Sequence, residues 1–325
     1  MLERCAGLVF GFLFRAGEAL RLRDETLAAA LAGGHDWVWF HLALSDHRAR
    51  RFLESFTDMP EAARALLLGT EDRVQFHLTA DGAWGILPDI EHDFAGESLG
   101  AGRFGFWLDG TRLITARRHP LRATEDLRDA VERGTLPRSP SQALALQQEY
   151  FIALVEQRLA VLGRELGRIE DAVLADREQG GAKLGPLRRE LSRYAREFSS
   201  LRSAIHRATG ARNVVAASPL LEHLPLLLQE AEDFERDVGA LLDRGRLLYE
   251  EIETRIASTT NRSLSALTVI STLLLPPTFL VGAFGMNLQG IPWAAHHSGF
   301  AFVFALCLAL VAGGYLVLRR FGILP

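Results

Sequence analysis

The residues best suited to chemistry lie near the carboxyl end, where Gly285, Met286 and Asn287 follow a long apolar stretch. A ring of Asn287 amide oxygens, contributed by several copies of the chain, can accept hydrogen bonds from the water shell of a divalent cation. Because the ion keeps its water, this arrangement suits cations that dehydrate reluctantly. Zinc without its water would prefer His or Cys ligands, and the apolar stretch before Gly285 contains neither. The triplet therefore favours the passage of a hydrated cation.

Two histidines, His296 and His297, follow the triplet. Between Arg262 and Arg319, the sequence contains no other histidine and no Asp, Glu, Lys or Arg. Because imidazole binds zinc and titrates near neutral pH, the pair could collect the metal or sense pH. The alternative is a pair that lies in solvent or against lipid headgroups, and the sequence leaves both open.

The segment around these residues has the composition of a membrane protein, since Asp, Glu, Lys and Arg are all missing from Ser263 to Leu318. A bilayer core needs roughly 20 apolar residues in a helix, and two stretches here are long enough. A pair of buried core helices would need a much larger soluble domain around it. We expect spans at 263–287 and 300–319, an external loop at 288–299 and a tail at 320–325.

The basic residues next to the spans predict their orientation. Arg255 and Arg262 precede the first span, Arg319 and Arg320 close the second, and the loop between them has no Lys or Arg. Because positive charges favour the cytoplasmic side, we expect both termini in the cytoplasm. Cys5 and Cys307 fall in different compartments under this topology, so no disulfide is expected.

The first 138 residues alternate short β-rich runs with short helical patterns, which predicts a cytosolic α/β domain. The pairs Asp81-Gly82 and Asp109-Gly110 lie between β-rich runs and predict two hairpins, because both turn positions tolerate positive φ. The predicted strands are 8–14, 37–42, 73–78, 83–87, 104–108 and 112–116, and the predicted helices are 24–31, 46–56, 60–68 and 124–133.

A helical period begins after these strands and predicts an antiparallel helical hairpin over 139–216, broken at 179–186 and capped by Gly210. A stalk helix over 217–262 follows, with apolar residues at alternating spacings of four and three from Leu227 to Ile252. No helix breaker separates the stalk from the first span. A helix this long needs partners, either other copies of the chain or the preceding hairpin.

This order of elements, with Gly-Met-Asn at the end of the first span, resembles the CorA superfamily of divalent metal ion transporters. The continuation from Leu288 to Trp293, with Ile291-Pro292, is most similar to the bacterial zinc-transporter branch, ZntB. The resemblance implies an α+β membrane protein of the bacterial inner membrane whose five copies form a funnel. Its implied partners are further copies of itself, membrane lipid and divalent cations, with no permanently bound cofactor.

The function that the resemblance implies is proton-coupled uptake of Zn²⁺, with Cd²⁺, Co²⁺ and Ni²⁺ as further substrates. The near alternative is a Mg²⁺ and Co²⁺ channel of the same architecture. The remote alternative is a membrane-tethered enzyme or signalling module. The sequence contains no phosphate-binding glycine loop, nucleophile elbow or His-Glu-x-x-His motif that would support this alternative. A net charge of -4 without a basic patch gives no reason to expect nucleic acid.

The resemblance also implies a conduction path that alternates apolar constrictions with hydroxyl or amide rings. The alternative is that the Ser and Thr side chains bond only to their own or a neighbouring helix. The residues placed on the path are Asn261, Leu264, Leu267, Thr272, Leu275 and Thr278.

One group in the cytosolic part could bind a regulatory metal at a subunit boundary, namely Asp89, Glu91, His92 and Asp93. The alternative is a solvated acidic loop, because a continuous run cannot easily turn every side chain toward one ion. His35, His41 and His77 are assigned to no site.

Overall fold

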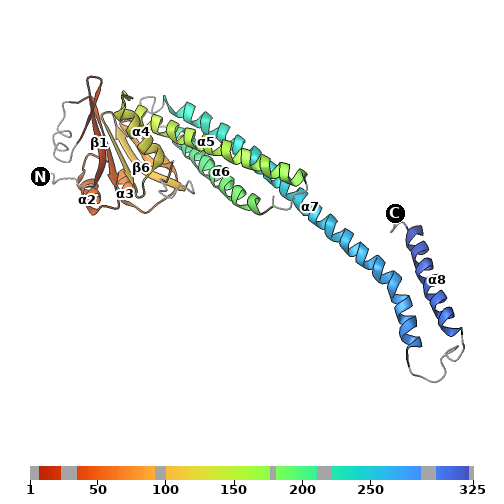
Figure 1. Ribbon diagram of the computed structural model, residues 1–325. Coiled ribbons are helices and arrows are strands. Elements are labelled where there is room, and N and C mark those ends of the chain that lie inside the picture. The colour runs from red at the N-terminus through yellow and green to blue at the C-terminus, as the bar shows by residue number, and fades with distance from the viewer. Residues whose placement is uncertain are drawn as a thin grey trace. The chain divides into compact units, whose positions relative to one another are not determined.

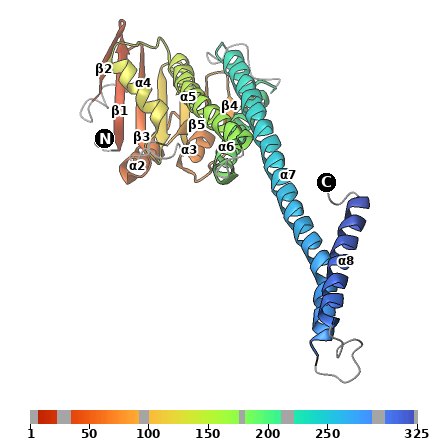
Figure 2. The same cartoon turned by 45° about the vertical axis from the view of Figure 1, so that its right-hand side comes forward.

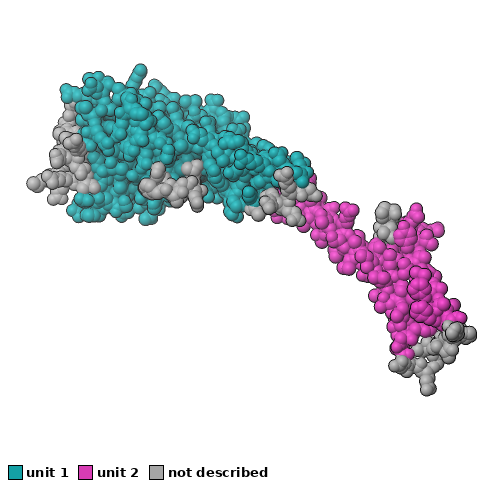
Figure 3. Space-filling view, in the orientation of Figure 1, with its two compact units in different colours: residues 1–247 teal, residues 248–325 magenta. Residues whose placement is uncertain are grey.

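The computed structural model describes residues 7–22, 35–91, 100–175, 181–210, 222–286 and 298–321, and Figure 1 traces their elements. The chain divides into two compact units, residues 1–247 and 248–325, coloured teal and magenta in Figure 3. The helix predicted at 24–31 lies outside the described residues.

A seven-stranded sheet with the order β2-β1-β3-β7-β6-β5-β4 forms the base of the first unit. Only β3 and β7 run parallel, and the other neighbouring strands are antiparallel. The six strands that the sequence predicts are present, and β2 is additional. The strands are β1 Leu8–Arg15, β2 Glu18–Arg21, β3 Trp37–Ala43, β4 Gln75–Leu78, β5 Gly82–Ile90, β6 Ala101–Asp109 and β7 Arg112–Arg117.

The turn between β1 and β2 uses Ala16 and Gly17, whose φ angles are 52° and 80°. Positive φ suits glycine but is uncommon for alanine, so this turn has no clear sequence signature. The Asp36 carboxylate accepts a hydrogen bond from the Ala16 N–H at 2.8 Å and helps to hold it. The strand that sequence reasoning misses is thus the one that follows an unusual turn.

The two predicted hairpins form at Asp81-Gly82 and Asp109-Gly110, but for a different reason from the one expected. Neither glycine has a positive φ. The second turn is held by the Asp109 carboxylate, which accepts hydrogen bonds from the N–H groups of Thr111 and Arg112 at 2.8 Å each. Aspartate therefore stabilises this turn by accepting local backbone hydrogen bonds.

One face of the sheet packs against α2 His47–Ser55 and α3 Glu61–Leu68. Alternate residues of β3, Val38, Phe40 and Leu42, share a buried cluster with side chains of these two helices. On the opposite face α5 contacts β3, β5, β6 and β7, and α4 packs against α5. The bounds are α4 Arg122–Glu132 and α5 Pro140–Leu174.

Three long helices complete the first unit. They are α5, α6 Gly181–Gly210 and the first part of α7 Leu224–Phe284. The Phe198 ring of α6 stacks on Phe151 of α5 and on Phe234 of α7, with centroid distances of 5.8 and 4.5 Å. The prediction that 179–186 breaks the helix is wrong for 181–186, because α6 begins at Gly181 and contains Pro186.

The apolar seam of the stalk is occupied within this bundle. Leu227, Ala231, Phe234 and Val238 are all buried. Arg202 of α6 donates to Glu235 at 2.7 Å beside them. The partner of this part of the stalk is therefore the helical hairpin, which was one of the two alternatives, and not another copy of the chain.

A charged cluster ties the sheet to the bundle. Arg103 of β6 donates to both carboxylate oxygens of Glu197 in α6 at 2.7 Å, and to Asp72 at 2.8 Å. The Arg103 and Glu197 side chains are only 20% and 14% exposed, so solvent screens this pair weakly.

Arg103→Ala is expected to lower the free energy of unfolding of the first unit by about 2–4 kcal/mol, because Glu197 loses its cation in a poorly solvated place. Urea unfolding followed by tryptophan fluorescence measures it. Arg21→Ala is the matched control, since the Arg21–Glu132 side chains are 61% and 37% exposed and such pairs contribute about 0–1 kcal/mol. Equal effects of the two changes would contradict the prediction.

The second unit consists of the rest of α7 and α8 Gly299–Arg320, which run antiparallel to each other (Figure 2). The helix α7 is continuous over 61 residues, as the sequence predicts. It ends at Phe284, earlier than predicted. Gly285 still donates its N–H to Val281 at 2.9 Å, and its low helix propensity is a reason for the helix to end there.

Candidate functional site

The residues placed on the conduction path lie along one side of α7. At about 100° per residue, they fall within an arc of roughly 140°. All of them are exposed in the single chain, and Leu264, Leu267 and Leu275 are 57%, 61% and 71% exposed. The six residues are Asn261, Leu264, Leu267, Thr272, Leu275 and Thr278.

The helix α8 covers the opposite side of α7. Glycine at position 314 allows the close approach, because a Cβ there would lie 3.1 Å from Leu273 Cδ2. The half-buried residues of α7 in this region are Val269, Leu273, Pro277, Leu280, Ala283 and Phe284. On the helical projection they lie roughly opposite the six exposed residues, so α8 leaves that face free.

The hydroxyl groups on this face bond to their own helix. Thr272 donates its hydroxyl hydrogen to the Thr268 carbonyl at 2.8 Å, and Thr278 donates to Leu274 at 2.7 Å. This is the alternative considered for these side chains. A hydroxyl oxygen that has donated its hydrogen still has lone pairs, so it can accept a hydrogen bond from a water molecule of a passing ion. The two interpretations are therefore compatible.

Two consecutive prolines, Pro276 and Pro277, leave backbone carbonyls free as acceptors near Thr272. Proline has no N–H, so the carbonyls of Thr272 and Leu273, four residues earlier in α7, lack their usual helical donors. Thr272 belongs to the exposed face. Its carbonyl oxygen is a second acceptor near its hydroxyl.

Both helices of the second unit have the length and composition of membrane spans. Their most apolar windows have mean hydropathies of 1.9 and 2.5, and only 0% and 6% of these windows are buried. Core helices of a soluble protein would be largely buried. The exposure therefore favours a lipid environment.

The Gly285-Met286-Asn287 triplet follows the end of α7 in the sequence. Gly285 and Met286 are the first residues after the helix, and Met286 is 49% exposed. Asn287, His296 and His297 lie outside the described residues, so their assignments stay predictions.

The acidic group predicted in the cytosolic part does not form as expected, because Asp89 is 1% exposed and lies on β5. Its carboxylate accepts hydrogen bonds from the N–H groups of Ile90, Ala123 and Thr124, the Thr124 hydroxyl and the Gln147 amide. Burial raises the pKa of Asp89 to about 6, against the effect of these hydrogen bonds. The residue is neither in a solvated loop nor open to a metal.

Of the other members of this group, the structure describes only Glu91. His92 and Asp93 lie outside the described residues. Among the residues that the structure does describe, no group of three or more His, Cys, Asp or Glu side chains could hold a metal ion. His41 is a buried core residue whose Nδ1 lies 2.8 Å from the Thr115 hydroxyl, and burial lowers its pKa well below the usual value.

Comparison with known proteins gives the family. The model of the CorA-like Mg²⁺ transporter protein family matches residues 34–320, so the chain belongs to this family. The zinc transport protein ZntB of Photorhabdus laumondii is 22% identical over 273 residues, which cover 84% of each chain. The divalent cation transporter CmaX of Pseudomonas aeruginosa is 23% identical and covers 97% of this chain and 96% of its own.

Solved structures show the same fold. The structure of full-length CmaX has a TM-score of 0.81 at 23% identity and covers 97% of both chains. The CorA magnesium transporter of Methanocaldococcus jannaschii has a TM-score of 0.71 at 16% identity and covers 97% of this chain and 98% of its own.

The chain is therefore a divalent-cation transporter of the CorA family, with an α/β domain, a long helix and a second apolar helix. Its homologues are named as transporters and not as enzymes, which disfavours the tethered-enzyme alternative.

Proposed function

We propose that five copies of this chain form a pore that moves Zn²⁺ across the bacterial inner membrane, with Cd²⁺, Co²⁺ and Ni²⁺ as further substrates. The observation that carries the proposal is the exposed, uncharged face of α7 opposite α8. In a family of divalent-cation transporters, such a face is suited to line a path between copies. The zinc preference rests on similarity to ZntB.

The proposed arrangement assigns each part of the chain a place. Both termini are cytoplasmic, and the external loop contains His296 and His297, which collect zinc at the mouth. The cytosolic domain is 1–138 and the hairpin 139–216, the stalk is 217–262, the spans are 263–287 and 300–319, the external loop is 288–299 and the tail is 320–325.

Within the pore, the chemistry is that of a hydrated cation. The side chains of Leu264, Leu267 and Leu275 narrow the path, while Asn261, Thr272 and Thr278 provide oxygen acceptors between them. None of these groups is charged, so none can replace the whole water shell of Zn²⁺. The ion therefore passes with water, and Asn287 selects it at the outer end.

Proton coupling is proposed from the resemblance to the zinc-transporter branch. Neither span contains Asp, Glu or His, which are the usual residues of a proton relay in a membrane. The imidazoles of the external loop are the nearest such groups to Asn287 in the sequence. We expect the coupling to act through protonation of this pair.

The function is tested by zinc entry into liposomes that contain the purified protein and a zinc-sensitive dye, with and without an inward proton gradient. Entry that the gradient accelerates, and that excess Mg²⁺ does not suppress, supports the proposal. No flux of any divalent cation would contradict it.

A Mg²⁺ channel is the second candidate, and the magnesium transporter named by the family model favours it. An uncharged oxygen-lined path suits Mg²⁺ equally, since Mg²⁺ keeps its water strongly. In the same liposomes, this candidate predicts Mg²⁺ entry that exceeds zinc entry and does not respond to the proton gradient.

A further inference from the structure

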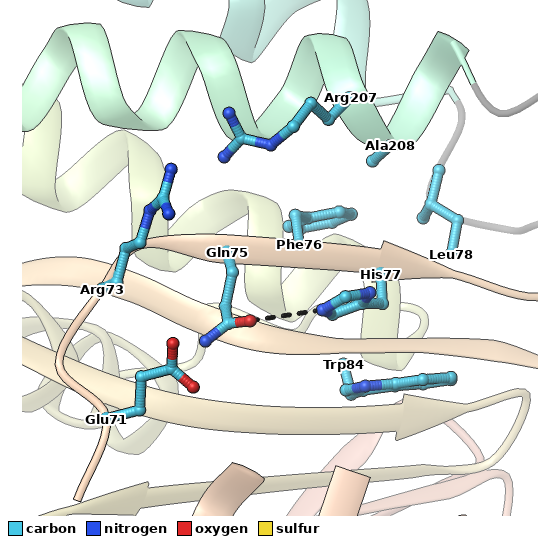
Figure 4. Close-up of a pocket in the computed structure, with 9 residues that line it drawn as sticks. All are labelled: Glu71, Arg73, Gln75, Phe76, His77, Leu78, Trp84, Arg207 and Ala208. Carbon is cyan, nitrogen blue, oxygen red and sulfur yellow. Dashed lines mark hydrogen bonds between the residues drawn. The ribbon is translucent and has the colours of Figure 1, made fainter. Parts of the chain in front are cut away.

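A cavity of about 450 Å³ lies in the first unit beside β4, the last strand of the sheet, and next to the carboxyl end of α6. This volume is in the range of small-molecule sites. Figure 4 shows basic side chains on the α6 side of β4 and amide, aromatic and acidic side chains on the other. The lining residues are Glu71, Arg73, Gln75, Phe76, His77, Leu78, Trp84, Arg207 and Ala208.

Two guanidinium groups converge on this cavity. Arg73 precedes β4 and Arg207 lies in the last turn of α6, and Figure 4 shows their guanidinium groups turned toward one another. Within the described part of the chain, neither forms an ion pair with a carboxylate. Nearby Arg103, in contrast, is paired with Asp72 and Glu197. Two like charges that point together without a counterion favour an anion between them.

The part of the lining on the other face of β4, away from α6, is aromatic. His77 of β4 and Trp84 of β5 are directly paired across the two strands, and their rings stack with centroids 5.5 Å apart and planes at 18°. His77 is exposed and Trp84 is half-buried. A stacked pair at a cavity wall offers a planar surface on which another ring can lie.

Polar groups for a ring edge lie beside this wall. The Gln75 amide oxygen lies 3.4 Å from His77 Nε2. The Gln75 amide nitrogen is buried and has no hydrogen-bond partner among the described residues. A buried N–H donor without a partner is costly, so a ligand acceptor would stabilise it. The Glu71 carboxylate is an acceptor for an amino group on the same side.

We propose that this cavity binds a mononucleotide that lies across the edge of β4, with the phosphate between Arg73 and Arg207 on the α6 side. The base lies on the His77 and Trp84 rings on the other side, with its edge near Gln75 and Glu71. Two arginines against one glutamate leave a net positive lining, which matches a phosphate monoester. A ring without phosphate or a phosphate without a ring would use only half of the lining. The transporter would thereby respond to a soluble nucleotide through its first unit.

Calorimetric titration of the full-length protein in detergent tests the proposal with AMP, adenosine, inorganic phosphate and glycerol 3-phosphate. We expect AMP to bind more tightly than the other three. Glycerol 3-phosphate represents a lipid headgroup. The proposal would be overturned if AMP did not bind. It would also be overturned if adenosine, inorganic phosphate or glycerol 3-phosphate bound as tightly as AMP.

Two variants locate the site. Arg207→Ala and Trp84→Leu are each expected to weaken AMP binding by about tenfold, the effect of losing one charged contact or one stacked ring. Arg138→Ala, an exposed arginine away from the cavity lining, is the control and should leave binding unchanged. Thermal unfolding checks that the variants are folded. Folded variants that bind AMP as tightly as the unchanged chain would also overturn the proposal.

Discussion

Asn287→Ala is expected to reduce zinc entry into liposomes at least about 100-fold. In the proposed pore, the change replaces a ring of amide oxygens at the outer end of the first span with methyl groups, so the water shell of the ion loses its hydrogen-bond acceptors. Losing even two of the ring's charge-assisted hydrogen bonds, at about 1.5 kcal/mol each, raises the barrier by about 3 kcal/mol. Initial rates of dye fluorescence, corrected for protein-free liposomes, measure the effect.

Gln289→Ala is the matched control for this experiment. It removes an amide side chain two residues later in the sequence, outside the triplet, and should leave zinc entry unchanged. Chromatography in detergent checks that both variants assemble as the unchanged chain does. Full zinc entry through an assembled Asn287→Ala protein would show that the amide ring does not control the path.

Asp89→Ala is expected to destabilise the first unit by about 3–5 kcal/mol. The carboxylate joins β5 to the start of α4 and to α5, and its removal takes away the acceptor of five buried hydrogen bonds. Four of the five tryptophans, Trp37, Trp39, Trp84 and Trp107, lie in this unit, so fluorescence during urea unfolding reports on it.

The pH dependence of unfolding provides a second measurement on Asp89. Its pKa rises from about 3.9 in an unfolded chain to about 6 in the fold. Between these values the folded state binds more protons than the unfolded state, so stability falls as pH rises from about 4 to about 6, by about 3 kcal/mol.

Asp89→Asn is the control for this measurement, because asparagine has a similar shape and does not titrate. The difference in unfolding free energy between the two proteins should change across that pH window and be constant above it. A difference that stays constant from pH 4 to pH 7 would contradict the raised pKa.

Much of the fold follows from local patterns in the sequence. The short apolar run of β3, buried on both faces of the sheet, and the uncharged segment from Ser263 to Leu318 each show from the sequence where those residues lie. The strands, the continuous α7 and the two apolar helices are therefore predictable. The turn at Ala16 and Gly17 is not, since it depends on a carboxylate twenty residues away.

The residues that pack against an apolar stripe, or bond to a buried group, are harder to predict than the stripe or the group itself. The seam from Leu227 to Val238 fits either a hairpin or other copies, and only the bundle shows that the hairpin occupies it. Asp89 is similar, because four of its five donors come from residues 34, 35 and 58 positions away. An acidic residue inside an apolar run was the available signal, since such a residue must be compensated by partners.

The orientation of the threonine hydroxyls in α7 also affects how the protein interacts with anions. Thr272 and Thr278 direct their only hydrogens into the helix backbone. The outer surface of these side chains thus presents lone pairs and no donors, a polarity that attracts positive ions and offers nothing to chloride or phosphate. In the proposed path, the two threonine levels therefore disfavour anions by the direction of their dipoles. Because hydroxyl groups do not ionise near neutral pH, this effect should be independent of pH.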